Sequence, residues 1–146
     1  VSYAADFTGK TSFQEMIDDG NLVDKPERVT RLIFCSGKVY YDLRAYRDEH
    51  KLRNAAIIRI EQLYPFNADL IKSIVQRYPR ANKKWVWCQE EPLNMGAWSY
   101  IRARLEKLGK HHVRYAGRDR SASPAAGSKA IHTREQKNLV EDAFSV

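Results

Sequence analysis

The stretch QEEPLNMGAW, residues 89–98, follows directly on the apolar run WVWC, residues 85–88. A continuous apolar run predicts a strand that is buried on both faces, and Pro92 cannot donate a hydrogen bond to a neighbouring strand. We therefore expect the strand to end before Pro92 and the chain to turn there. Asn94 is a suitable N-cap, and apolar residues recur every three or four positions beyond it, which predicts a helix from about Met95 to Leu108. The stretch is a polar corner between a strand and a helix, and open α/β sheets bind ligands at such corners.

The same alternation of apolar runs and helical periods extends through the chain. Strands are expected at residues 29–35, 55–60, 85–88 and 113–116. Helices are expected at residues 39–51, 67–78 and 95–108 and at the end of the chain, from about Ile131 to Phe144. Asn67 is a good N-cap for the second helix, and Pro79 stops it. Strands that alternate with helices form right-handed βαβ units, so the sequence predicts an α/β fold, a three-layer α/β/α sandwich with a mostly parallel sheet.

Residues 1–28 show no sustained hydrophobic period. Phe13, Met16 and Ile17 offer at most one short turn that docks on a core, while DDG at 18–20 and DKP at 24–26 are typical of turns. We expect this segment to be a linker or arm, the core to begin after Pro26, and one domain to occupy residues 29–146.

The bulk composition is that of one globular domain. The 146 residues are 43% hydrophobic, and no apolar run approaches the roughly 20 residues that cross a bilayer. The first residues lack the basic region followed by a hydrophobic region that is typical of a targeting signal. The chain begins without Met, which favours a fragment of a longer protein. Two cysteines, Cys35 and Cys88, each end an apolar run, so we expect buried free thiols and a reducing compartment.

The formal net charge is +7, from 25 basic and 18 acidic side chains. Such an excess is found in proteins that bind nucleic acids, acidic membranes or acidic partners. The basic residues are scattered, however, mostly near the ends of the expected helices, where they complement the helix dipole. We therefore expect neither nucleic acid nor membrane as a partner.

Two segments have the chemistry of an anion site. CSGK, residues 35–38, lies between a strand and a helix, although it lacks the spacing of a Walker loop or a dinucleotide fingerprint. It is either a tight turn that needs Gly37 or a place where Lys38 holds an anion. The loop over residues 117–128 carries Arg118, Arg120 and two serines ahead of a helix, which is either an anion cradle or a flexible connection.

No catalytic or metal site is evident in the sequence. Glu90 and Glu91 are adjacent on an extended segment, so they point to opposite faces and cannot act as a general acid and base on one substrate atom. With Gln89 and Asn94, they are better explained as hydrogen-bonding groups at a domain interface. The four histidines have no ligand spacing with either cysteine, and Ser123 has no histidine base nearby in sequence.

Six blocks of sequence carry a resemblance. They are CSGKVYYDL at 35–43, RIEQLYPF at 59–66, QEEPLNMGAW at 89–98, YAGR at 115–118, SASPA at 121–125, and IH followed by EQ within 131–136. In this order and spacing they resemble the carboxyl-terminal domain of the first, decarboxylating component of the 2-oxoglutarate dehydrogenase complex. The resemblance covers about residues 28–146, and the preceding residues resemble the linker into this domain.

The resemblance implies a transketolase carboxyl-terminal-like domain that supports assembly and regulation. In the family, thiamine diphosphate and Mg²⁺ are held by two preceding domains, and the succinyl group formed from 2-oxoglutarate passes to a lipoyl group on the second component of this tricarboxylic acid cycle complex. It further implies a homodimer, located in the cytoplasm of a bacterium or the mitochondrial matrix of a eukaryote. This chain alone is then expected to hold no cofactor and to be inactive.

Two alternatives stay open. One is the same domain of the related 2-oxoadipate dehydrogenase, because Met95 replaces the Gln that is common in relatives. The other is a stand-alone module that senses coenzyme A or adenine nucleotides. Lys38, Arg118 and Arg120 are the candidates for a regulatory anion site, chosen for their anion chemistry.

Overall fold

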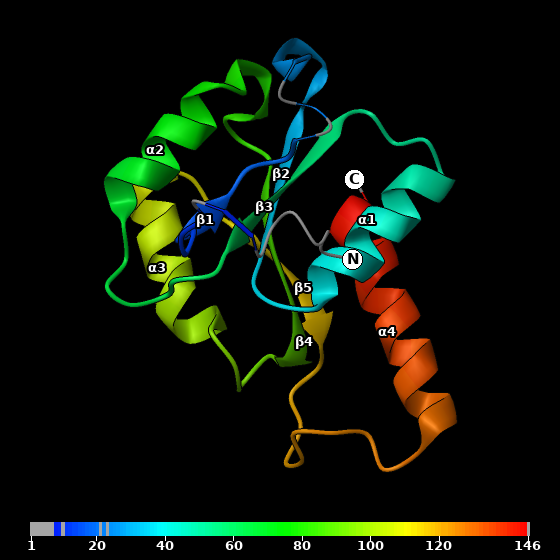
Figure 1. Cartoon of the computed structure of the whole chain (residues 1–146). Helices are drawn as coiled ribbons and strands as arrows, with labels where there is room; N and C mark the ends of the chain where they lie inside the picture. Colours follow the sequence, from blue (N-terminus) through cyan, green and yellow to red (C-terminus); the bar gives the residue numbers. More distant parts are fainter. Residues whose placement is uncertain (1–7, 10, 21, 23, 146) are drawn as a thin grey trace.

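The computed structural model describes residues 8–9, 11–20, 22 and 24–145, and its centre is a five-stranded, mostly parallel sheet (Figure 1). The strands are β1 (Met16–Ile17), β2 (Arg31–Cys35), β3 (Ala55–Ile60), β4 (Trp85–Pro92) and β5 (Arg114–Arg118). Their order in the sheet is β1-β3-β2-β4-β5. All pairs are parallel except β1 with β3, which confirms the expected α/β class.

Four α-helices connect or follow these strands. They are α1 (Val39–Glu49), α2 (Ala68–Gln76), α3 (Trp98–Gly109) and α4 (Lys129–Phe144), with short 3₁₀ turns at Pro26–Arg28 and Pro79–Ala81. Figure 1 shows α2 and α3 on one side of the sheet and α1 and α4 on the other. None of the helices in the described residues has the length and hydropathy of a membrane span.

Each face of the sheet buries its own set of side chains. Leu32 and Phe34 pack with residues of α2 and α3, whereas Ile33 and Cys35 pack with residues of α1 and α4. Successive residues of a strand point to opposite faces, so a strand covered by helices on both sides must be apolar throughout. This explains why the central strands appear in the sequence as uninterrupted apolar runs.

Local signals in the sequence place several elements correctly. β3 spans the predicted residues 55–60, and the side chain of Asn67 caps α2 by accepting a hydrogen bond from Leu70 N at 3.0 Å. Pro79 starts a 3₁₀ turn after α2 has ended at Gln76.

The predicted end of the third strand is wrong. β4 continues to Pro92, with a register shift against β5 between Cys88 and Pro92. Pro92 has no N–H to donate to β5. The next residue does so instead, because Leu93 N donates to Arg118 O at 3.0 Å, and the hydrogen bonding between the two segments therefore continues beyond the proline. The helix that follows begins at Trp98 and not near Met95.

The core begins before Pro26, not after it. Met16 and Leu22 are buried, and β1 pairs antiparallel with the carboxyl end of β3. Asp19 is also buried; one of its carboxylate oxygens accepts from Ile57 N at 2.9 Å and pairs with Arg47 of α1. Residues 16–20 and Leu22 therefore belong to the folded unit, although they were expected to lie in an arm. Phe13 remains exposed, and residues 1–7 lie outside the described part of the chain.

The two cysteines are free and buried, as predicted. Cys35 of β2 and Cys88 of β4 are partners in register, and burial raises the pKa of both thiols. Because the thiolate is the reactive form, we expect no reaction of the native chain with an aromatic disulfide reagent at pH 8. Two thiols per chain should react in denaturant. A rapid reaction of either thiol in the native state would contradict the burial that the structure shows.

Candidate functional site

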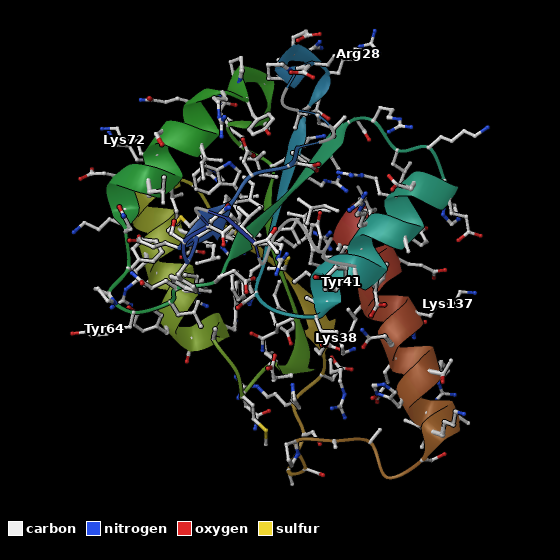
Figure 2. All side chains as sticks on the ribbon, viewed as in Figure 1. Arg28, Lys38, Tyr41, Tyr64, Lys72 and Lys137 are labelled. Carbon is white, nitrogen blue, oxygen red and sulfur yellow. The ribbon has the colours of Figure 1, made fainter. Side chains whose placement is uncertain are left out.

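The carboxyl ends of the parallel strands form the edge where a site is expected. From β2 the chain passes through α1 to β3 on one side, and from β3 it returns through α2 to β4 on the other side of β2. The strand order therefore reverses between β2 and β4, and open α/β sheets bind ligands at such a switch point. Lys38 follows β2 and Glu90 lies near the end of β4, and their Nζ and Oε1 atoms are 2.8 Å apart. Figure 2 shows Lys38 at the start of α1.

Lys38 is held in a network of acidic and amide groups. Glu90 Oε1 also accepts from Gln136 Nε2 at 3.0 Å, and the same amide donates to Asp42 Oδ2 at 2.7 Å. The hydrogen bond to Glu90 raises the pKa of Lys38, whose side chain is 69% exposed. An anion at Lys38 would have to compete with two carboxylates that are already in place. The network instead ties α1, β4 and α4 together at the switch point.

A second contact joins the ends of β2 and β3. Gly37 has a φ of +70°, which confirms the predicted tight turn, and its N–H donates to Glu61 Oε1 at 3.3 Å. The same oxygen pairs with Arg59 Nε at 3.1 Å, and the Arg59 guanidinium lies 4.7 Å from the centre of the Tyr40 ring. The turn after β2 is therefore fixed by Glu61, just beyond β3, and by Arg59 at the end of β3.

Gln89 organises the corner from inside. Its side chain is buried, and its Oε1 accepts from Trp87 Nε1 at 2.9 Å and from Trp98 N at 3.0 Å. Its Nε2 lies within hydrogen-bonding distance of three backbone carbonyls, those of residues 91, 92 and 95. Gly96 has a φ of +66°, and a Cβ there would come within 2.8 Å of the same amide nitrogen. A single amide thus fixes both the end of β4 and the start of α3.

Asn94 anchors the loop that follows β5, and it is not the N-cap of α3, where Ala97 stands. Its Nδ2 donates to Ser121 O and its Oδ1 accepts from Ser121 N, both at 3.0 Å. The side-chain amide of Asn94 therefore bonds both backbone groups of Ser121, as a residue of a neighbouring strand would. Arg118 fixes the same loop, because Nη1 donates to Pro124 O at 2.9 Å while Nε pairs with Glu135 Oε2 of α4 at 2.7 Å. The loop is anchored at two points.

The structure brings two of the three anion candidates together. Arg118 and Arg120 line a hollow of about 330 Å³ between the end of β5 and α4, together with Ser121 and acidic groups that include Glu135. Lys38 is not among its lining residues. Of these two arginines, Arg118 is already paired with Glu135, whereas the side chain of Arg120 is exposed to solvent.

Nearly the whole chain matches one family of proteins. Residues 1–144 fit the family described as 2-oxoglutarate dehydrogenase C-terminal. The chain belongs to this family. Among its relatives, the 2-oxoglutarate dehydrogenase E1 component of Coxiella burnetii is 50% identical over 125 residues, covering 83% of this chain and 13% of the relative. That of Haemophilus influenzae is 47% identical over 136 residues, covering 92% and 14%. The mitochondrial 2-oxoglutarate dehydrogenase of Dictyostelium discoideum is 43% identical over 128 residues, covering 84% and 12%.

The chain spans only a small part of these three relatives, 12% to 14% of their length. Glu90 and Glu91 lie at the corner of this domain and diverge as expected, since Glu90 contacts Lys38 and Gln136 while Glu91 is exposed. Among the described residues, no three His, Cys, Asp or Glu side chains gather as a possible metal site.

Tyr115 lies at the site, although it was not among the site residues predicted from the sequence. Its hydroxyl lies 3.0 Å from both Glu91 O and Arg118 O, and its ring is 5.2 Å from that of Trp98. The hydroxyl therefore joins the corner to the end of β5. The contacts of the Tyr115 hydroxyl depend on the register shift between β4 and β5, and no pattern in the sequence predicts that shift.

Burial raises the pKa of Tyr115 to about 12. A folded pKa above the unfolded value of about 10 means that the contribution of Tyr115 to stability is complete below pH 10 and is lost as the pH rises towards 12. Absorbance at 295 nm should show a tyrosine that titrates near pH 12 and is missing from Tyr115→Phe. If Tyr115→Phe left the late titration unchanged, this assignment would be wrong.

Proposed function

We propose that this chain is the assembly and regulatory domain of a thiamine diphosphate-dependent 2-oxoglutarate dehydrogenase, with the three-layer α/β/α architecture of transketolase carboxyl-terminal domains. Membership of the family supports the first part of this proposal. The sheet supports the second, because it is covered by α1 and α4 on one face and by α2 and α3 on the other.

The reaction is assigned to the remaining part of the longer enzyme. We place thiamine diphosphate and Mg²⁺ on domains that precede this one, and the described residues of this chain contain no cluster of three possible metal ligands. The carboxylate of Glu90 at the switch point is bonded to Lys38 and Gln136. Oxidative decarboxylation of 2-oxoglutarate and succinyl transfer to the lipoyl group of the second component would then occur on domains that this chain supports.

The assembly role is supported mainly by the rigid corner, residues 89–98, at the carboxyl ends of the parallel strands. Gln89 holds it from within, and Asn94 joins it to the loop after β5. Glu91 and Asn94 are exposed there, and Glu90 is partly exposed. A rigid surface with outward polar groups suits a neighbouring domain, because binding it requires little further ordering.

A decarboxylation assay tests the division of labour. The 146-residue chain with 2-oxoglutarate, thiamine diphosphate and Mg²⁺ should release no carbon dioxide above background. In the full-length enzyme, Glu91→Arg should lower activity while leaving the melting temperature of the isolated chain unchanged. Turnover by the isolated chain would contradict the proposal, and so would full activity of the Glu91→Arg enzyme.

The same proposal includes a homodimer, a lipoyl-bearing second component, and a location in the cytoplasm or the mitochondrial matrix. The related 2-oxoadipate dehydrogenase is the alternative within this class. Comparing the rates of the full-length enzyme with 2-oxoglutarate and 2-oxoadipate separates the two, since the preferred substrate should give the higher kcat/KM.

A regulatory anion site is a second candidate function, and the hollow lined by Arg118 and Arg120 favours it. Acetyl-coenzyme A and AMP carry the phosphates that an arginine fork binds. Calorimetric titration of the chain with each ligand tests the site, with Arg120→Ala expected to weaken binding and the exposed Arg53→Ala as the matched control. Absence of heat with both ligands would exclude the sensing role for this chain.

A further inference from the structure

Two large aromatic side chains are exposed near the carboxyl end of β3. Tyr64 is 81% exposed on the loop between β3 and α2, and Phe13 is 70% exposed three residues before β1. Figure 2 shows Tyr64 on the outside of this loop, pointing away from the sheet. In the described part of the chain, the only other exposed large apolar side chain is Ile131 of α4, at 42%. Exposed apolar groups that gather in one place mark interaction sites.

Backbone pairing brings the two aromatic residues to the same end of the sheet. β1 runs antiparallel to β3, and the pairing extends beyond both strands, because Glu61 N and Gln62 N each donate to Glu15 O at 2.9 Å. Phe13 lies two residues before Glu15, and Tyr64 lies two residues after Gln62. Segments of an antiparallel pair that leave it at equal distances from a bonded position leave at the same end. Both rings therefore lie at the carboxyl end of β3.

The backbone that carries these side chains is held in place. Glu15 Oε2 accepts a hydrogen bond from Asn67 Nδ2 at 2.7 Å, which ties the segment before β1 to the start of α2. Leu63 and Phe66, on either side of Tyr64, are partly buried against the core. The loop thus uses its other apolar residues for its own packing and leaves Tyr64 outside. A ring on an ordered loop loses little further freedom when a partner covers it, which favours binding.

The charged groups at this end of the sheet already have partners. The Glu61 carboxylate pairs with Arg59 at 3.1 Å, and the Glu15 carboxylate is bonded to Asn67. Aromatic residues are enriched and charged residues depleted in the centres of protein interfaces. The two rings with these satisfied carboxylates therefore fit an apolar protein surface and not a charged ligand.

The polypeptide outside this chain supplies such a surface. The chain covers 12% to 14% of the three relatives described above, and its family is that of a C-terminal segment, so most of their length precedes the matched part. In the proposed enzyme, the preceding domain joins this chain on the side of Phe13, which is among the first described residues. The loop that carries Tyr64 also lies along the same edge of the sheet as the corner at residues 89–98.

We propose that Phe13 and Tyr64 form an apolar contact surface for the domain that precedes this one in the longer enzyme. Burying one aromatic side chain removes roughly 150–250 Å² from water, so two rings provide a large share of an interface between domains, which is roughly 600–1,500 Å² in area. This inference rests on the proposed function, and it extends the interface of the assembly domain from the polar corner after β4 to the end of β3.

Photocrosslinking in the full-length enzyme tests the identity of the partner. p-Benzoylphenylalanine replaces Tyr64 in one variant and Phe13 in another, and mass spectrometry identifies the peptides that are joined after irradiation. We expect both probes to crosslink to the part of the enzyme that precedes this domain. Crosslinks from both probes only to this same domain in a second copy, or none from either probe, would overturn the proposal.

Hydrogen exchange tests whether the two rings hold the contact. Amide exchange at residues 62–66 should be at least about tenfold slower in the full-length enzyme than in the isolated chain, because a covering domain restricts the opening of the loop. Phe13→Ser with Tyr64→Ser should remove most of this protection, whereas the matched change Ile131→Ser should keep it. Because all three residues are exposed, the melting temperature of the isolated chain should change by no more than about 2 °C in either variant.

The failure of this inference can be told from that of the proposed function. If the unmutated full-length enzyme released no carbon dioxide from 2-oxoglutarate or 2-oxoadipate, the proposed function would be wrong, and this inference would fail with it. If an active full-length enzyme exchanged residues 62–66 as fast as the isolated chain does, or kept its protection in the double variant, only the contact surface would be wrong.

Discussion

An Asp19→Ala variant is expected to lose about 3–5 kcal/mol of unfolding free energy, the usual cost of breaking a buried ion pair from one side. Asp19 and Arg47 are each only 1% exposed, so the substitution leaves a guanidinium buried without its carboxylate. Ile57 N also loses its acceptor. Urea unfolding followed by tryptophan fluorescence measures the change.

Two further variants test whether the buried ion pair explains the loss of stability. Asp48→Ala also removes a carboxylate near Arg47, at 3.5 Å from Nε, but Asp48 is exposed, so its loss should cost no more than about 1 kcal/mol. Asp19→Leu combined with Arg47→Met should cost less than Asp19→Ala alone, since no charge remains buried. If Asp19→Ala and Asp48→Ala were equally mild, the pair of Asp19 and Arg47 would not hold residues 16–20 in place.

A Gln89→Leu variant is expected to lose about 3 kcal/mol, because two buried N–H groups lose their acceptor and each unsatisfied group costs roughly 1–3 kcal/mol. The donors are Trp87 Nε1 and Trp98 N. The near-ultraviolet circular dichroism should weaken along with the stability, since both tryptophans adjoin the corner. Hydrogen exchange at residues 93–98 should accelerate.

The matched change is Gln62→Leu. Among the described residues, the side chain of Gln62 makes one exposed hydrogen bond, from Nε2 to Pro65 O at 3.2 Å, and the loss of this bond should cost no more than about 0.5 kcal/mol. A Gln89→Leu chain as stable as the Gln62→Leu chain would show that the corner is held by packing and not by this amide.

The sequence predicts most of this fold because its signals are local. The apolar run at 55–60 and the cap at Asn67 depend on neighbours a few residues away, and both predictions are confirmed. β1 was missed because its two residues have no period, and its place is set by pairing with Ile60 and by the bond between Asp19 and Arg47. The extension of β4 was missed because Pro92 ends a ladder only where its N–H is needed.

The site is less predictable because it depends on contacts between distant segments. That Glu90 and Glu91 diverge follows from strand geometry alone. The sequence does not reveal that Glu90 pairs with Lys38, or that Asn94 binds Ser121 instead of capping α3. The charge of Lys38 suggested an anion, whereas the fold supplies a carboxylate at 2.8 Å. Whether Arg118 and Arg120 bind an anion stays a prediction.

The short antiparallel strand β1 has a consequence for where this polypeptide can be cut. Met16 and Ile17 pair with the end of β3, and the Asp19 carboxylate accepts a hydrogen bond from the N–H of Ile57 in the same strand. A version shortened to start at Val29 would leave the apolar strand AAIIRI with an open edge, a template on which further molecules can add strand by strand. Such a trimmed protein should form insoluble aggregates during expression, while one that retains residues 11–28 should stay dispersed.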